Sequence, residues 1–221
     1  DEQEKIFAEK ELGLHARIFV AGNFPGLFNY TEIQGKKAGA LKLISIGLIS
    51  PMKNYMPVLN ALKTIGQKHP EFFIDYAIYG SVKDENYWQQ CKAIIDGLPE
   101  NIKVTWHGAV APASIENALS QNNVFILPSI SENFGHSIIE ALSAGRPVIT
   151  SNGTPWNNLQ QTKAGVNTKV DEQSIAAAIS LFATMQQDEL TVWSKAAANY
   201  ARQAIDINEL KQQYKTMFGK L

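Results

Sequence analysis

The sequence contains a single cysteine, Cys91, so it has neither a disulfide framework nor a cysteine-based metal site. Such low cysteine usage is typical of a reducing compartment. No apolar run approaches the roughly 18 residues that a membrane-spanning helix needs, and the N-terminus has no signal-peptide pattern. Neither sign of charge dominates, since 20 Lys and Arg residues balance 21 Asp and Glu residues. We therefore expect a cytoplasmic protein that does not bind nucleic acid.

An initiator methionine is also absent, because the first residue is Asp1. We therefore expect the chain to be processed, or to be a fragment of a longer protein. Its 221 residues favour one large domain, or one and a half. Hydrophobic residues make up 45% of the chain and charged residues 19%, a composition that allows a sizeable buried core.

From residue 41 onward, apolar segments alternate with segments of helical periodicity. The first apolar segment is "LKLISIG", and the helix expected after it has Asn54 as a candidate N-cap. The alternation predicts an α/β fold: a doubly wound, parallel, six-stranded Rossmann-like sheet with helices on both faces, in the strand order 3-2-1-4-5-6. Strands are expected at 41–47, 72–80, 102–108, 123–128, 146–151 and 164–170, and helices at 54–69, 87–95, 112–119 and 135–143.

The two ends of the chain do not follow this alternation. Residues 1–40 hold a helical pattern at 4–14 and a strand-like pattern at 16–22, and then the connector "NFPGLFNYTEIQGKKAGA". We expect 1–40 to be a lead-in segment, the remnant of an interdomain connector, and 41–221 to be the sheet domain with a helical C-terminal tail. The tail helices are expected at 174–185, 190–203 and 208–218.

The expected topology brings two distant loops together. Ligands of a doubly wound sheet bind beyond the carboxyl ends of the strands, where the winding reverses, which here is between the first and fourth strands. The loop "GLISPMKN" offers Lys53, and the loop "PSISENFG" leads into a helix that begins near Gly135. A lysine beside a helix N-terminus is a phosphate site. Glu132 and Glu140 flank it and would accept hydrogen bonds from hydroxyls, so the expected ligand is a phosphate ester of a sugar.

These motifs resemble the donor-binding half of GT-B-type retaining glycosyltransferases of family four. That family has two glutamates separated by seven residues, preceded by Pro-Ser and followed by Gly-x-Pro-Val-Ile, and this sequence reads "PSISENFGHSIIEALSAGRPVI". The family's Gly-Arg motif, with a lysine five residues after the arginine, reads Gly47, Leu48 and Lys53 here. The resemblance covers about residues 41–185. The segments "ENFGH", "TPW" and "DENYWQQC" also look like a subgroup associated with bacterial surface-polysaccharide assembly.

The resemblance implies retaining, metal-independent glycosyl transfer from a nucleoside diphosphate sugar, with no further cofactor. Lys53 and Glu132 would be catalytic, with Glu132 near the hydroxyls of the transferred sugar, and Glu140 would hold the ribose hydroxyls. Backbone N–H groups of 134–136 would meet the diphosphate or the sugar, and 108–110 would approach the nucleobase. The implied substrate-binding residues besides Glu140 are Gly47, Gly108, Ala109, Val110, Ser129, Phe134, Gly135, His136 and Thr154.

The resemblance also implies a partner domain. In such enzymes the acceptor lies largely on an amino-terminal domain, which we expect to be absent from this chain. Alone, the chain should bind a nucleotide sugar weakly and transfer nothing, because half of the enclosing cleft is missing. Any association with the inner face of the cytoplasmic membrane should be peripheral and should occur only through the full-length protein.

Leu48 departs from the family pattern, because it stands where the family has a phosphate-binding arginine. Arg146 cannot replace that arginine, since it is expected at the opposite, amino end of the fifth strand. Two interpretations therefore stay open: the donor domain of a glycosyltransferase, or a non-catalytic nucleotide-sugar-binding module of GT-B descent. A nucleotide-sugar epimerase is a third, but the paired glutamates after Pro-Ser favour a transferase.

Overall fold

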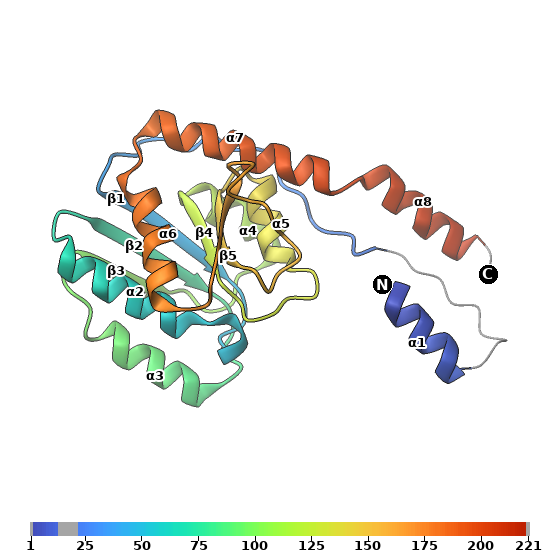
Figure 1. The fold of residues 1–221 in the computed structure, drawn as a ribbon, viewed down its shortest axis with the longest axis horizontal. Helices are drawn as coiled ribbons and strands as arrows, with labels where there is room; N and C mark the ends of the chain where they lie inside the picture. The colour runs from blue at the N-terminus through green and yellow to red at the C-terminus, as the bar shows by residue number, and fades with distance from the viewer. Residues whose placement is uncertain (1, 13–21, 220–221) are drawn as a thin grey trace.

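The chain forms one parallel six-stranded sheet (Figure 1), and the computed structural model describes residues 2–12 and 22–219. The strand order is β3-β2-β1-β4-β5-β6, as the sequence predicts, and every adjacent pair is parallel. The strand pattern at 16–22 lies almost entirely outside the described residues. The strands are β1 (Ala40–Ile46), β2 (Phe73–Tyr79), β3 (Ile102–Trp106), β4 (Val124–Leu127), β5 (Val148–Ser151) and β6 (Gly165–Thr168).

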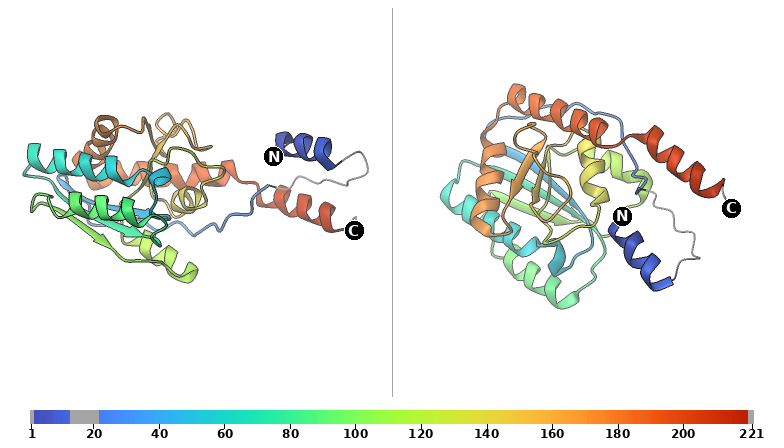
Figure 2. Two further views of the ribbon diagram at one scale, coloured as in Figure 1. Left: turned by 90° about the horizontal axis from the view of Figure 1, so that it is seen from below. Right: turned by 45° about the vertical axis from the view of Figure 1, so that its right-hand side comes forward.

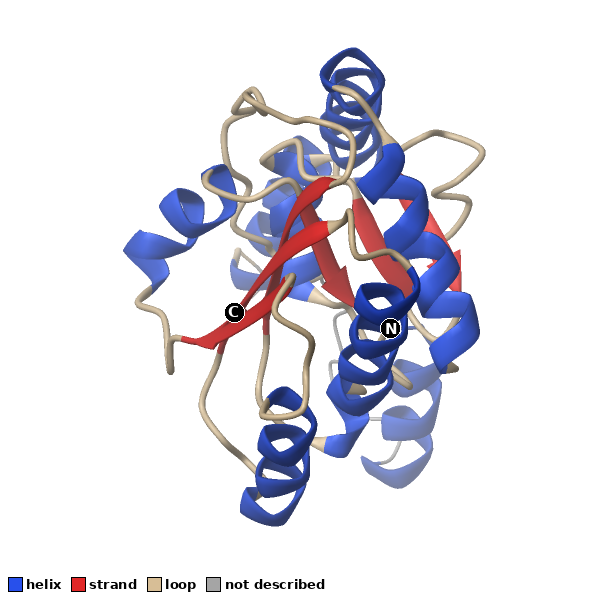
Figure 3. Ribbon diagram, turned by 90° about the vertical axis from the view of Figure 1, so that its left-hand side faces the viewer, coloured by secondary structure: helices blue, strands red, loops and turns tan. Residues whose placement is uncertain are grey.

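Helices cover both faces of the sheet (Figure 3). On one face α2 packs against α6 and α3, and on the other α5 packs against α7. This two-sided cover explains why β4 and β5 are buried at every position and read as unbroken apolar or small segments. The helical elements are α1 (Glu2–Leu12), the 3₁₀ turn η1 (Pro51–Lys53), α2 (Tyr55–Lys68), α3 (Glu85–Ile95), α4 (Pro112–Ser120), α5 (His136–Ser143), α6 (Glu172–Thr184), α7 (Gln187–Ala204) and α8 (Ile207–Phe218).

Asn54 stands at the N-cap position of α2, but the expectation that its side chain caps the helix is wrong. Its backbone is left-handed, with φ of 61°, and its side chain makes no capping hydrogen bond. Instead the Asn54 amide donates to the carbonyl oxygen of Val170 at 3.0 Å. The residue therefore ties the start of α2 to the segment that follows β6.

The connector that precedes β1 packs on the sheet domain rather than standing free. The Phe28 N–H donates to Ser143 Oγ at 2.9 Å, and the Thr31 N–H donates to the Ala144 carbonyl at 3.3 Å. Arg146 is fully buried beneath the connector at the amino end of β5, where its guanidinium donates to backbone carbonyls that include those of Thr31 and Asn122. Burial lowers the pKa of Arg146 to about 10. Its position keeps it away from the carboxyl ends of the strands, as expected.

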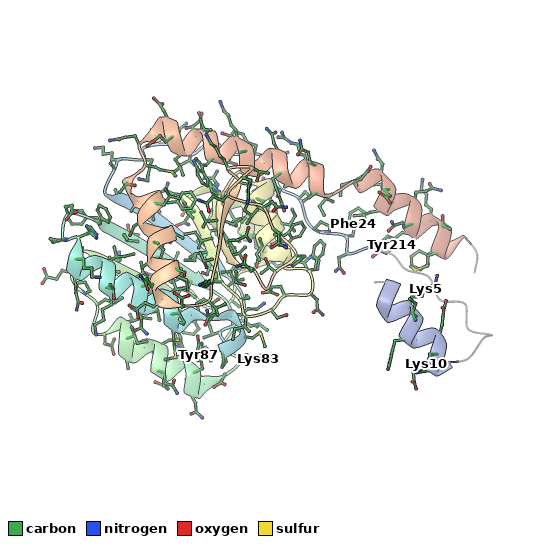
Figure 4. The ribbon with its side chains drawn as sticks, viewed as in Figure 1. Lys5, Lys10, Phe24, Lys83, Tyr87 and Tyr214 are labelled. Carbon is green, nitrogen blue, oxygen red and sulfur yellow. The ribbon has the colours of Figure 1, made fainter. Side chains whose placement is uncertain are left out.

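The last helix extends beyond the sheet domain (Figure 2). No residue of α8 is buried, and its side chains touch the start of the connector. The Tyr214 hydroxyl donates to the Gly22 carbonyl at 3.1 Å, and the Tyr214 ring meets Phe24 edge-on with centroids 6.2 Å apart (Figure 4). Phe24 and Phe218 remain exposed. An apolar, solvent-facing strip therefore runs along this helix and the connector.

Candidate functional site

A cleft of about 780 Å³ opens at the carboxyl ends of β1 and β4, where the winding reverses. The loops that follow these two strands face each other across it. Its lining residues are Asn23, Ile46, Gly47, Leu48, Ser50, Met52, Lys53, Lys83, Ser131, Glu132, Asn133, Phe134, Gly135, His136, Ser137 and Glu140. The structure therefore brings together Lys53, Glu132 and Glu140, which the sequence assigned to one site.

Lys53 and Glu132 form an ion pair across the cleft. The ammonium nitrogen of Lys53 lies 2.5 Å from Glu132 Oε1, and the side chains are 21% and 12% exposed. Ser129 Oγ donates to the same carboxylate oxygen at 2.7 Å. The Glu132 carboxylate thus binds Lys53 through one oxygen, and its negative charge neutralises the positive charge of the lysine.

Backbone contacts fix the loop that carries Glu132. The Glu132 N–H donates to the Gly153 carbonyl at 3.0 Å, and the Ile130 N–H donates to the Met52 carbonyl at 2.8 Å. A side chain at Gly153 would place its Cβ 2.1 Å from the Ile130 carbonyl oxygen, so only glycine allows this approach. The loops after β1, β4 and β5 are therefore joined next to the cleft.

The N-terminus of α5 opens into the cleft next to this loop. Gly135 starts the helix with a left-handed φ of 73°, and a Cβ there would lie 3.2 Å from Trp156 Nε1. The Trp156 indole donates to the Phe134 carbonyl at 2.6 Å and holds the turn from the buried side. Because the first intrahelical hydrogen bonds reach back to Gly135 only from Ile138 onward, the N–H groups of the first turn are available to an anion.

Glu140 lies one turn further along α5, with its carboxylate half-buried in the cleft wall. Burial raises its pKa to about 7. Among the described residues no donor bonds to this carboxylate. The connector approaches it closely, since a Cβ built on Gly26 would lie 3.6 Å from Glu140 Oε1. Within the described part of the chain, Glu140 is therefore a cleft-lining carboxylate with no donor, and its role in holding ribose hydroxyls stays a prediction.

The remaining predicted substrate-binding residues divide into three groups. Gly47, Phe134, Gly135 and His136 line the cleft. Ser129 and Thr154 are buried with their hydroxyls turned to protein acceptors, Glu132 and the Ser151 carbonyl, so they position the loops. Their direct contact with substrate stays a prediction.

The third group, residues 108–110, lies at the same edge of the sheet but outside the cleft lining. The Gly80 N–H donates to the Gly108 carbonyl at 2.7 Å, and the Gly47 N–H donates to the Tyr79 carbonyl at 2.9 Å. These bonds align the ends of β1, β2 and β3 in one row. A ligand that extends from the cleft along this row would reach 108–110, and their role at the nucleobase stays a prediction.

Sequence reasoning missed Lys83, which also lines the cleft. It follows β2, the neighbour of β1, and stands three residues after Gly80. The predicted strand order places the end of β2 beside the cleft, so that order and the cation were the available signal. Leu48, which replaces the family arginine, is 47% exposed and also lines the cleft.

The described residues hold neither a candidate metal site nor a candidate membrane-spanning helix. Within residues 2–12 and 22–219 no group of three or more His, Cys, Asp or Glu side chains could hold a metal ion. In the same part of the chain no helix has the length and apolar character to span a membrane.

Known proteins match most of this chain. A family model described as "Glycosyl transferases group 1" matches residues 28–202. The alpha-monoglucosyldiacylglycerol synthase of Streptococcus pneumoniae is 29% identical over 173 residues, which is 76% of this chain and 38% of that protein. The chain thus spans well under half the length of this relative.

Solved structures also share the fold, and two of them contain UDP. Anabaena HepE, in complex with UDP and glucose, superposes with a TM-score of 0.67 at 19% identity, over 83% of this chain and 49% of that one. A variant of S. aureus TarM, in complex with fondaparinux, alpha-GlcNAc-glycerol and UDP, gives a TM-score of 0.72 at 14% identity, over 99% of this chain and 42% of that one.

Proposed function

We propose that this chain, which belongs to the family of glycosyl transferases group 1, is the donor-binding domain of a glycosyltransferase that uses a nucleoside diphosphate sugar. The observation that carries the proposal is the cleft at the β1–β4 switch point. There a helix N-terminus and two lysines face two carboxylates. The anion-binding groups suit the diphosphate, and the carboxylates suit hydroxyls on either side of it.

In the proposed complex the diphosphate lies at the N-terminus of α5, beside Lys53. Glu140 accepts hydrogen bonds from the ribose, because its carboxylate lies in the cleft without a donor among the described residues. Glu132 lies on the other side of the helix N-terminus and meets the hydroxyls of the sugar. The nucleobase then extends toward 108–110, along the row of strand ends.

The reaction we propose is retaining transfer of the sugar, in which the bond between the anomeric carbon and the diphosphate oxygen breaks. Negative charge grows on the leaving diphosphate, and Lys53 and the α5 N-terminus stabilise it electrostatically. Lys53 starts from its ion pair with Glu132. We propose that hydroxyls of the bound sugar donate hydrogen bonds to Glu132 and weaken its ion pair with Lys53. The lysine can then bind the diphosphate as negative charge grows on it. No metal ion is needed for this role.

We further propose that the acceptor binds on a part of the enzyme other than the described sheet domain. The chain covers 38% of its synthase relative and 49% and 42% of the two solved chains, which supports a second domain across the cleft. The exposed Leu48, Met52 and Ile130 near the cleft fit a surface that such a domain would cover. A surface-polysaccharide or lipopolysaccharide acceptor is the finer proposal, and it rests on the segments "ENFGH", "TPW" and "DENYWQQC".

Leu48 favours a second candidate, a nucleotide-sugar-binding module without transfer activity. Loss of one charge-assisted hydrogen bond to phosphate costs about 1.5–3 kcal/mol of binding free energy. Such a loss could end catalysis while binding survives. Hydrolysis of nucleotide sugars by the full-length protein separates the two candidates, because only a transferase breaks the glycosidic bond.

Titration calorimetry with UDP-sugars and GDP-sugars tests donor binding, with Glu140→Ala as the matched variant. We expect the wild type to bind one class of donor, and Glu140→Ala to lose about 1.5–3 kcal/mol of binding free energy, because a charged acceptor for the ribose is removed. Equal affinities for a folded variant and the wild type would contradict the ribose role. A wild type that binds no nucleotide sugar would contradict the proposed function.

A further inference from the structure

Two lysines, Lys53 and Lys83, line the cleft, and within residues 2–12 and 22–219 an ion pair is formed by Lys53 alone of the two. Lys53 is engaged by Glu132 at 2.5 Å. Among the described residues no carboxylate lies within ion-pair distance of Lys83, whose exposed side chain lines the same cleft. We infer that Lys83 is a donor-binding residue that contacts the diphosphate and supplies the positive charge that Leu48 lacks. This inference rests on the proposed function.

Hydrogen bonds hold the backbone of Lys83 beside Ile49, the residue that follows Leu48. The loop after β2 pairs with the loop after β1 through a parallel bridge between Ile49 and Val82. The Lys83 N–H donates to the Ile49 carbonyl at 3.0 Å, and the Ile49 N–H donates to the Ser81 carbonyl at 2.9 Å. Lys83 therefore stands next to the residue after Leu48, on the adjoining strand end.

The segment that carries Lys83 is anchored on its other side as well. Asp84 caps α3, because its Oδ1 accepts the Tyr87 N–H at 2.9 Å, and the Asp84 N–H points to the Ile49 carbonyl at 3.2 Å. The Tyr87 hydroxyl in turn accepts the Met56 N–H from the first turn of α2 at 2.9 Å. Figure 4 labels Lys83 beside Tyr87 at this junction. With the backbone fixed, only the lysine side chain has to be ordered when a phosphate binds.

The balance of charges in the cleft favours a further cation as a diphosphate contact. Lys53 and Glu132 cancel, and Glu140 adds a negative charge once it is ionised above its pKa of about 7. Without Lys83, a diphosphate would enter a site with no net positive charge and only the dipole of α5 to attract it. With Lys83, the row formed by the ends of β1 and β2 presents an ammonium group on the side of the cleft opposite α5.

The test is the affinity of the chain for UDP and GDP, measured by calorimetry over a salt series, with uridine and guanosine as phosphate-free probes. Lys83→Gln should raise the dissociation constant of the bound diphosphate about tenfold and flatten its salt dependence, since one charged contact is lost. It should leave nucleoside binding unchanged. Lys83→Arg should bind within about twofold of the wild type, because it keeps the charge.

Lys68→Gln is the matched control, because Lys68 is exposed in the last turn of α2, at the other end of that helix. It should change diphosphate affinity by less than about twofold, because surface charges more than a Debye length apart are largely screened. In the Lys83→Gln background, Leu48→Arg should restore affinity. Wild-type affinity in Lys83→Gln, or an equal loss in Lys68→Gln, would overturn the role of Lys83 and leave the proposed function standing. A wild type that binds neither UDP nor GDP would overturn both.

Discussion

Lys53 on the loop after β1 and Glu132 on the loop after β4 meet at 2.5 Å, although 78 residues of chain separate them. Ser129 donates to the same carboxylate oxygen, so this oxygen joins both loops. The pair therefore lies where the loops after β1 and β4 meet, in the cleft that Glu140 also lines. It also means that a bound phosphate and Glu132 compete for the same lysine.

Removal of the negative charge of Glu132 should strengthen the binding of a diphosphate to Lys53. Glu132→Gln should bind free UDP or GDP about threefold more tightly, since one negative charge roughly 6 Å from a phosphate in water costs about 0.7 kcal/mol. Calorimetry with the free diphosphate measures the effect. Glu100→Gln, which removes an exposed acid outside the cleft lining, is the control. Unchanged or weaker diphosphate binding in Glu132→Gln would mean that the ion pair does not restrain Lys53.

Restoration of the family arginine should strengthen the site. Leu48 is 47% exposed and lines the cleft, so Leu48→Arg can place a guanidinium beside the phosphates without disturbing the core. Diphosphate affinity should rise about tenfold at low salt and fall back as salt screens the added charge. A flat response across the salt series would show that position 48 does not point at the phosphates.

The raised pKa of Glu140 makes the stability of the unliganded chain depend on pH. Because burial raises that pKa from 4.5 to about 7, the folded state holds the proton more tightly than the unfolded chain does. The contribution of Glu140 to stability should therefore fall as pH rises from about 4.5 to about 7, and stay level above that. Glu140→Gln removes this dependence and should melt at a higher temperature than the wild type at pH 8.

Thermal unfolding of both proteins at pH 5 and pH 8 measures this difference. The gap in melting temperature should be small at pH 5 and larger at pH 8. Glu100→Gln provides the comparison for an exposed acid. A gap that is the same at both values would mean that Glu140 ionises in the fold as readily as in the unfolded chain.

A side chain at Gly135, the residue that starts α5, should destabilise the fold. Gly135→Ala places a Cβ 3.1 Å from Ile138 Cδ1 and forces an alanine into a left-handed φ of 73°. We expect a loss of about 1–2 kcal/mol in the free energy of unfolding. Gly97→Ala is the control, because Gly97 has no such φ and a Cβ there would meet nothing closer than 3.5 Å. Equal stability of the two variants, measured by denaturant titration, would contradict the strain.

The strand order and the location of the cleft were predictable, because apolar strands that alternate with amphipathic helices allow few sheet topologies. The family motifs then placed Lys53, Glu132 and Glu140 at one site. The direct contact between Lys53 and Glu132 was not predictable. It depends on hydrogen bonds between loops, such as that from Ile130 to Met52, which leave no periodic signal.

The direction in which a side chain points was also not predictable from the sequence. Ser129 and Thr154 sit within the motifs, yet their hydroxyls face protein acceptors that only the folded loops provide. Asn54 has the residue type of an N-cap, but the distant Val170 carbonyl takes its amide. Lys83 had no motif, and its place in the cleft follows from the pairing of Ile49 with Val82.

Donor binding is tested most directly by a crystal structure of this chain with a nucleoside diphosphate sugar, grown with UDP-sugars and GDP-sugars in parallel. We predict the diphosphate at the N-terminus of α5 beside Lys53, with the ribose hydroxyls on Glu140. A nucleotide bound elsewhere on the chain, or one bound in the cleft with its ribose away from Glu140 and its phosphates away from α5, would contradict the assignment of this site.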